Sequence, residues 1–402
     1  MLSVESKLGL PTGEGGKLNR LATERWKERL VRLVPVKNKV IWVNPNFPNL
    51  PFGLKLNEQT PLGLFVKSVL PENPATGKLK EGSQIGEHLP SHHRSILLTR
   101  AMLADNNGQV YRDIDLKGIG YVSTKGYEEY LHGAEVEVNT LASVQSRGES
   151  GYYGLFEEIS AMYDRDKSEE FNALGIRTPR ALAIIELLEV ICKDGMVSIS
   201  SLKEKGILPQ DSSPVIEVRV FRNKARISDY ACTRPGNYSL FARDYGSDDF
   251  LPRVLLADAK EIIRQELGLN SEISDSDYFK YLVKLVATNI GLMHKSGWMH
   301  NYLTVHNITL NGDIADFDSV SQLENFFDQE RDIVSALGTL VEFNAFLGNL
   351  KLDIEFLYET YPQIHEKLVK EFWESYLQVF PAEQQRSGYL DFDRLNARFS
   401  LK

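Results

Sequence analysis

The spacing of the hydrophobic residues changes along this chain, and that change limits the folds open to it. Up to about residue 250, apolar residues gather in short β-branched runs such as PVIEVRVF at 214–221, which favour strands. From residue 253 onward they recur at helical spacing, as in YFKYLVKLVATNIGLMHK at 278–295. The sequence therefore predicts an α+β protein in which a β-rich part is followed by a helical part.

Composition narrows the class of protein further. Of the 402 residues, 42% are hydrophobic and 25% charged, so the chain can bury a substantial core. The net charge of −9 argues against nucleic acid as the main partner. Cys192 and Cys232 show no metal-ligand spacing, which favours buried thiols in a reducing, cytoplasmic compartment. Neither a run of about 18 apolar residues nor a signal peptide is found, which predicts no membrane span.

The first 83 residues are expected to form an N-terminal extension. Residues 17–34, KLNRLATERWKERLVRLV, have the pattern of a basic amphipathic helix. We expect this helix to pack on the body of the protein, with contact to a membrane surface as the alternative. The prolines that follow, to about residue 80, predict an irregular, draped segment.

A small sheet is predicted to begin at residue 94. RSILLTRAML and VYRDIDLKGIG form two expected strands joined by the polar turn ADNNGQ at 104–109. Residues 122–150 are polar and weakly periodic, as in an insertion on this sheet. One helix is expected over 154–174, and the run ALAIIELLEVI at 181–191 fits a strand or a buried helix.

Residues 297–320, GWMHNYLTVHNITLNGDIADFDSV, carry the most informative pattern. They predict a strand at 308–310, a tight turn at 311–312 and a second strand, with Asn307 and Asp316 at the same end of the hairpin. An amide oxygen beside a carboxylate suits Mg²⁺ or Mn²⁺ when the ion also holds substrate phosphates. The alternative is a pair of residues that only stabilises the turn.

Protein kinases use such an Asn and Asp as metal ligands, with a catalytic Asp five residues before the Asn. Here that position holds Tyr302, and His300 stands where a kinase has the His of its His-Arg-Asp motif. The metal ligands are thus kept without the usual base. This combination resembles the selenoprotein O family, kinase-fold pseudokinases that transfer AMP to protein hydroxyls. The hairpin matches that family's His-Gly-x-x-Asn-Thr-Asp-Asn…Ile-Asp-Tyr-Gly pattern without gaps.

The resemblance extends over residues 84–320 and implies a phosphate-binding lysine with an acidic partner. IDLKGIG is similar to the strand that carries the ATP-phosphate lysine, which makes Lys117 that residue. NALGIRTPRALAII is similar to the run that ends the helix of the paired acid, and this places the acid at Asp164. Glu157 and Glu158, one to two turns earlier, are the alternatives.

Further nucleotide contacts follow from the same resemblance. VIEVRVFRNKARISDY is similar to the segment with two arginines seven residues apart, here Arg219 and Arg226. In the family these bind ATP in a flipped orientation, with the γ-phosphate buried and the α-phosphate facing the acceptor. Attack on that phosphorus gives an AMP ester and pyrophosphate. Arg94 and Gly154 fall in the counterparts of two other nucleotide-contacting segments, and Asp316 contacts the nucleotide through the metal.

The sequence also departs from the family pattern. Glycines of the Gly-Asp-Gly-Arg segments are lost before Arg94, which limits close approach of the backbone to phosphates. The Asp that precedes the metal-binding Asn is His306, whose neutral imidazole could accept a hydroxyl proton. Asp318 replaces a glycine as a possible extra ligand, His300 is expected to be structural, and Asp332 is expected to support the catalytic loop.

Together these features predict a kinase-like bilobal fold with an N-terminal extension at 1–83, a nucleotide-binding N-lobe at 84–235 and a helical C-lobe at 236–402. The predicted activity is transfer of AMP from ATP to a Ser, Thr or Tyr hydroxyl of an unidentified protein or peptide, with Mg²⁺ or Mn²⁺. One alternative is transfer of UMP or of the γ-phosphate to a peptide or small molecule. The other is an inactive, nucleotide-binding pseudokinase scaffold.

Overall fold

The computed structural model divides the chain into two compact units. Unit 1 comprises Met1–Asp166, Arg180–Lys224 and Tyr238–Gly246, and unit 2 comprises Lys167–Pro179, Ala225–Asn237 and Ser247–Lys402. The structure describes residues 30–65, 84–87, 92, 94–120, 154–192, 195–232, 250–348, 354–382 and 392–400. The predicted helical residues 17–29 and the predicted insertion at 122–150 lie outside the described residues.

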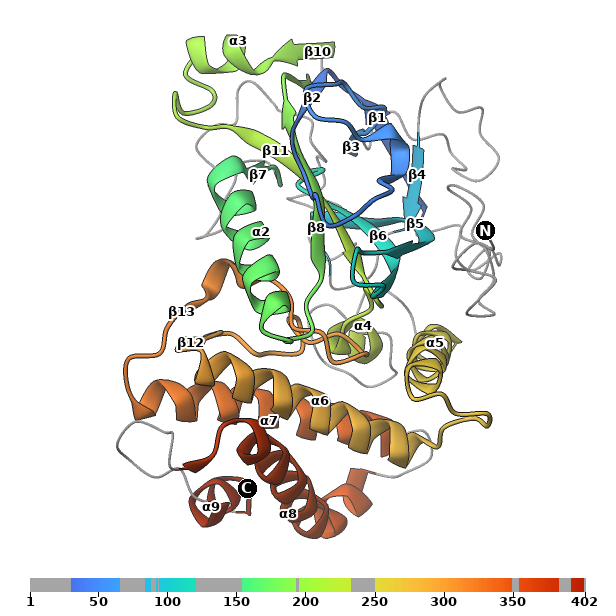
Figure 1. Ribbon diagram of the computed structural model, residues 1–402, viewed down its shortest axis with the longest axis vertical. Helices are drawn as coiled ribbons and strands as arrows, with labels where there is room; N and C mark the ends of the chain where they lie inside the picture. The colour runs from blue at the N-terminus through green and yellow to red at the C-terminus, as the bar shows by residue number, and fades with distance from the viewer. Residues whose placement is uncertain are drawn as a thin grey trace. The chain divides into compact units, whose positions relative to one another are not determined.

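Unit 1 is built on one antiparallel sheet (Figure 1). Within the described residues the sheet has nine strands in the order β2-β8-β11-β6-β5-β4-β1-β3, and β7 pairs with β11 beside this path. The strands are β1 (Leu30–Pro35), β2 (Asn38–Val43), β3 (Gly63–Phe65), β4 (Gln84–Glu87), β5 (Ser95–Ala104), β6 (Val110–Lys117), β7 (Phe156–Glu157), β8 (Arg180–Leu187) and β11 (Pro214–Phe221). A separate hairpin of β9 (Glu189–Cys192) and β10 (Gly195–Ser198) precedes α3 (Ile199–Glu204), and a short 3₁₀ turn, η2, spans Pro51–Gly53.

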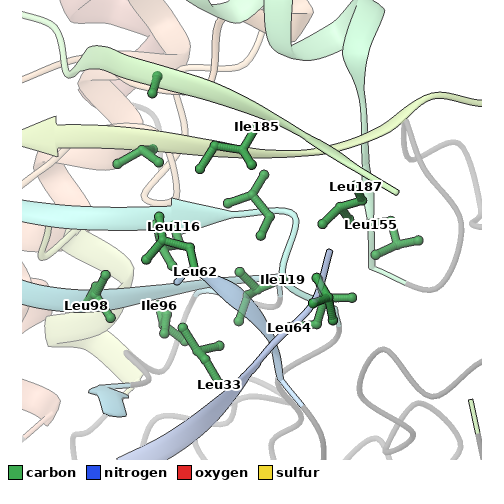
Figure 2. Packing of buried hydrophobic residues seen from close by; sticks show 14 of the residues in the cluster. Leu33, Leu62, Leu64, Ile96, Leu98, Leu116, Ile119, Leu155, Ile185 and Leu187 are labelled. Carbon is green, nitrogen blue, oxygen red and sulfur yellow. The ribbon is translucent and has the colours of Figure 1, made fainter. Parts of the chain in front are cut away.

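The link between β1 and β2 shows that this sheet is strongly curled. Two residues join these strands, so their facing ends lie within about 11 Å of each other. In the strand order, however, they are six steps apart, which would be about 29 Å across a flat sheet. The sheet therefore bends around a core of leucine and isoleucine side chains, among them Leu33, Leu64 and Ile185 (Figure 2).

The structure corrects two expectations for the N-terminal extension. Residues 30–35, 38–43 and 63–65 are not irregular, because they form β1, β2 and β3 of the sheet, whereas residues 44–62 between β2 and β3 contain no strand, as expected. The predicted helix at 17–34 is wrong at its end, where Leu30–Pro35 is a strand that buries Leu33 and Val34. The prolines mark strand ends and the turn between β2 and β3, where the missing N–H costs no ladder hydrogen bond.

Unit 2 is mainly helical (Figure 1). The helix α6 (Asp275–Lys295) begins and ends at the residues that the sequence predicted. Ser274 Oγ accepts a hydrogen bond from the backbone N–H of Asp277 at 3.0 Å, and Gly297 ends the helical segment with φ of +86°. The helices are α4 (Ile227–Cys232), α5 (Phe250–Glu266), α6 (Asp275–Lys295), α7 (Phe326–Gly348), α8 (Ile354–Val379) and α9 (Phe392–Ser400), with β12 (Trp298–Met299), β13 (Ser321–Gln322) and the 3₁₀ turn η5 (Phe317–Ser319) between α6 and α7. The helix α2 (Glu158–Ala173) contributes residues to both units.

The described elements form a mixed α/β protein, with a sheet in unit 1 and helices in unit 2. The β5–β6 hairpin, the strand β8 and the helix α6 confirm the corresponding sequence predictions. None of the described helices is both long enough and apolar enough to cross a membrane.

Candidate functional site

A buried ion pair in unit 1 joins two of the predicted site residues. Lys117 is the last residue of β6, and its Nζ lies 3.3 Å from Oδ2 of Asp164 on α2. Both side chains are almost fully buried, and the Lys117 ammonium also lies 4.4 Å from the centre of the Phe156 ring. Arg219 Nη1 approaches the same Asp164 oxygen at 3.6 Å. Asp164 therefore holds two cations from neighbouring strands.

The two alternative acids have other partners. Glu157 accepts hydrogen bonds from Ser212 Oγ and from the backbone N–H of Ser213, each at 2.7 Å. Glu158 accepts one from Ser213 Oγ at 2.8 Å. Of the three acids that the sequence left open, the structure pairs Asp164 with Lys117.

The backbone after Lys117 requires a glycine. Gly118 has φ of +91°, and a Cβ at this position would lie 2.5 Å from the carbonyl oxygen of Val215. Its N–H donates to the carbonyl of Arg94 at 2.9 Å, and the Arg94 guanidinium lies 5.0 Å from the Phe156 ring centre. This turn thus brings Arg94 and Lys117 onto one aromatic ring.

Gly154 is hydrogen-bonded to the turn that follows Lys117. Its carbonyl accepts a hydrogen bond from the N–H of Gly120 at 3.2 Å, and its φ is +72°. The predicted nucleotide-contacting glycine is therefore tied to the turn that follows Lys117.

A second carboxylate in unit 1 was not predicted from the sequence. Asp115 on β6 accepts a 2.8 Å hydrogen bond from Arg219 Nε and pairs with the buried ammonium of Lys224. Lys224 also donates to Ser95 Oγ at 3.1 Å. Burial alone would raise the pKa of Asp115, but the charges and hydrogen bonds of Arg219 and Lys224 bring it well below its ordinary value. Asp115 is therefore ionised.

Glu217 is a further buried acid near Lys117 that was not predicted from the sequence. It lies directly opposite Lys117 in the β6–β11 register, and within the described residues its Oε2 has no hydrogen-bond partner. Burial, followed by the charge of Asp164 and a hydrogen bond to it, raises the pKa of Glu217 well above its ordinary value, although the charges of Arg219 and Lys117 oppose this shift. Because side chains alternate along a strand, Glu217 could have been placed on the same face as Arg219.

In unit 2 the predicted hairpin is present in a compact form. Thr309 N–H donates to Asp313 at 3.0 Å, and Ile308 bridges Ile314 without longer strands. Ala315 N–H donates to the carbonyl of Asn307 at 3.0 Å, so Asn307 and the residue after Ala315 lie at the open end of the hairpin. That residue is Asp316, and the structure brings the two predicted metal ligands to one end as expected from the turn.

The two ligand side chains are held in different ways. Asn307 donates from Nδ2 to the carbonyl of Tyr302 at 2.9 Å, which leaves its Oδ1 as the end that could bind a cation. Asp316 has φ of +62°, a left-handed backbone conformation that residues other than glycine adopt at a cost in free energy. Phe317, the next residue, packs edge-on against Phe171, with 5.2 Å between the ring centres, and this contact holds the backbone beside Asp316.

Arg226 forms an ion pair with the predicted metal ligand. Its Nη2 lies 2.8 Å from Asp316 Oδ2, and its backbone N–H donates to Asp229 at 2.8 Å. The arginine is buried, yet within the described residues its Nε has no hydrogen-bond partner. Arg219 belongs to unit 1 and Arg226 to unit 2, so the two predicted phosphate-binding arginines have separate partners.

His300 supports the hairpin rather than facing solvent. Its Nε2 lies 3.0 Å from the carbonyl of Ala315, and its Nδ1 accepts the N–H of Tyr302 at 3.3 Å. Burial lowers the pKa of His300, although the charge of Asp332 opposes this shift, so the ring is neutral with its proton on Nε2. Asp332 accepts the backbone N–H groups of His300 at 2.6 Å and Asn301 at 2.8 Å. Both residues thus have the supporting contacts expected of them.

His306, the predicted base, is half-buried next to Asn307, and its backbone N–H lies 3.4 Å from Thr304 Oγ1. Asp318 is exposed two residues after Asp316. Among the described residues, no group of three or more His, Cys, Asp or Glu side chains could hold a metal ion. Asn307 and Asp316 nevertheless offer two hard oxygen donors, which fits Mg²⁺ or Mn²⁺ when phosphates and water complete the shell.

Comparisons with known proteins add little to this geometry. No family model matches the chain, and no curated protein matches it. Among solved structures, it is similar to a Toxoplasma gondii specific rhoptry antigen kinase domain, with 9% sequence identity and a TM-score of 0.28 over 77% of this chain and 80% of that one. At so low a TM-score the likeness does not define a shared fold, so function has to be argued from this chain's own residues.

Proposed function

We propose that this chain is a kinase-like nucleotidyltransferase of the selenoprotein O type, which transfers AMP from ATP to a Ser, Thr or Tyr hydroxyl of a protein. The Lys117–Asp164 ion pair is the observation that carries the proposal. Protein kinases require a strand lysine paired with a helix acid for activity. Here the lysine stands at the end of a strand, and its acid comes from a helix 47 residues later. The Asn307–Asp316 pair adds the second recurring part of such enzymes.

We assign phosphate binding to the cations around this pair. Lys117 would act as a point charge on the phosphates, and Arg94, whose guanidinium lies over the same Phe156 ring, would bind them as well. Arg219 is already engaged by Asp115 and Asp164, so it would also keep the acid of Lys117 in place. Gly154 would allow the backbone to approach the nucleotide closely.

Asn307 and Asp316 would hold Mg²⁺ or Mn²⁺, which when bound supplies positive charge to the phosphate oxygens. In the transfer itself, the acceptor hydroxyl oxygen forms a bond to the α-phosphorus of ATP. The bond between that phosphorus and the bridging oxygen of the β-phosphate breaks, and pyrophosphate leaves. We assign the hydroxyl proton to His306, whose imidazole can accept it near neutral pH.

One observation favours a second candidate, an inactive nucleotide-binding scaffold. The Arg226 guanidinium lies 2.8 Å from the Asp316 carboxylate. A cation therefore already contacts the side chain that a metal would need. A chain in which this pair never opens would bind nucleotide without transferring any part of it.

Incubation with Mn²⁺ and ATP labelled at either the α- or the γ-phosphate separates these functions. The wild type is expected to incorporate α-label only, and Asp316→Asn to lose it by about two orders of magnitude. Glu272→Gln, a change at an exposed acid of the same unit, is the matched control and should keep the label. Incorporation of γ-label only would replace the proposal with a kinase, and label from UTP alone with a UMP transferase. Thermal stabilisation by ATP without any label would favour the scaffold.

A further inference from the structure

Tyr302 is an exposed aromatic residue at an otherwise well-anchored point of unit 2. Its side chain is 55% exposed, although most large apolar residues around it are buried. It occupies the position five residues before Asn307, where a kinase has its catalytic Asp. The loop therefore presents a phenol where the carboxylate would stand.

The backbone of Tyr302 is fixed from both sides. Its N–H donates to His300 Nδ1 at 3.3 Å, and its carbonyl accepts Asn307 Nδ2 at 2.9 Å. The preceding Asn301 is held by Asp332, and the carbonyl of Leu303 accepts Thr339 Oγ1 at 3.0 Å. The Tyr302 ring is therefore attached to a well-anchored backbone, whose carbonyl is hydrogen-bonded to the proposed metal ligand Asn307.

The chemistry of this position identifies what the phenol could do. In phosphoryl-transfer enzymes with this loop, the side chain here faces the hydroxyl of the acceptor. A phenol is a poor substitute for a carboxylate as proton acceptor, but it is itself a nucleophilic hydroxyl of the type that such enzymes modify.

We propose that Tyr302 is a self-modification site, at which the chain places AMP on its own phenol oxygen. This inference rests on the proposed function. Tyr302 Oη forms a bond to the α-phosphorus of ATP, the bond from that phosphorus to the β-phosphate oxygen breaks, pyrophosphate leaves, and the phenol proton passes to His306 or to water. The resulting AMP group would stand where an external acceptor has to approach, so self-modification slows transfer to other proteins.

The direct test maps the modified residue in the wild-type chain. After incubation with Mn²⁺ and ATP, tandem mass spectrometry of a digest should find an adduct of about 329 Da, the mass expected for AMP from the α-phosphate, on Tyr302. Tyr302→Phe should abolish this adduct. Tyr163→Phe, which removes a 37% exposed phenol from α2, should leave it unchanged. The labelled fraction per unit time should not depend on protein concentration, because donor and acceptor belong to one chain.

Each other result overturns the inference in a distinguishable way. An adduct on another residue, with Tyr302 unmodified, removes the self-modification site but leaves the proposed function standing. Pyrophosphate release without any adduct on the chain does the same. No adduct and no pyrophosphate removes both proposals. A labelled fraction per unit time that rises with protein concentration would show that one chain modifies another.

Discussion

The cationic side chains in unit 1 and at the open end of the hairpin in unit 2 differ in how they are paired with carboxylates. In unit 1, Lys117, Arg219 and Lys224 each contact a carboxylate inside the protein, and the carboxylates are shared between them. In unit 2 one arginine, Arg226, pairs with a partly exposed Asp316 on a strained backbone. A shared, buried network cannot lose one member without leaving another charge unpaired, whereas a pair whose carboxylate is partly exposed can open toward water. We infer that the first is a fixed scaffold and the second is exchangeable.

The largest expected effect comes from breaking the fixed network. Asp115→Ala would leave the fully buried Lys224 and the buried Arg219 without their closest carboxylate. The free energy of unfolding should fall by about 3–5 kcal/mol, as for other buried pairs that lose one partner. Urea unfolding measures this change. Asp166→Ala, at a 63% exposed partner of Arg165, should cost less than about 0.5 kcal/mol. Equal losses in the two variants would contradict the contrast.

A smaller effect is expected at the exchangeable pair. Arg226→Met removes the cation that lies 2.8 Å from Asp316 and keeps most of the side-chain length. Mn²⁺ should then bind roughly tenfold more tightly in the absence of nucleotide, a change of about 1.4 kcal/mol. Electron paramagnetic resonance of free Mn²⁺ measures the affinity without any need for activity. Arg264→Met on α5 is the control, and an unchanged affinity in Arg226→Met would argue that Asp316 does not bind the cation.

The smallest effect is a change in the pH dependence of stability. Because the pKa of Glu217 is raised in the folded protein, its contribution to stability is fully present below its ordinary value of about 4.3 and is lost as the pH rises through the folded value. Glu217→Gln keeps a neutral side chain at every pH. Its free energy of unfolding should therefore decline less than that of the wild type between pH 5 and the alkaline range. Parallel pH profiles would show that Glu217 is ionised.

Much of the fold could be predicted because it follows from local periodicity. The alternation in VYRDIDLK and the helical stripe after Ser274 indicated β6 and α6 directly. The strands at 30–65 could not be predicted in the same way, because their hydrogen bonds are made to segments far along the chain, such as β2 to β8. Prolines near strand ends also look the same in sequence as prolines in an irregular segment.

The candidate site, like the fold, could be predicted only where the pattern is local in the sequence. The hairpin could be predicted because its turn sets the spacing of Asn307 and Asp316. The resemblance placed the acid at Asp164, but only the structure separates it from Glu157 and Glu158, which have partners on a distant segment. The Arg226–Asp316 pair joins residues ninety positions apart, and no local pattern records it.

The curled sheet of unit 1 has a practical consequence for where the chain can be cut. The two-residue link between β1 and β2 connects β2, at one end of the strand order, to β1, which lies between β4 and β3 near the other end. A chain shortened to begin after residue 43 would lose both strands at once. It would uncover the backbone N–H and C=O groups of β8 and of β4, and exposed strand rims of this kind pair with other chains. The strands β1 and β2 therefore protect the sheet of unit 1 from pairing with other chains.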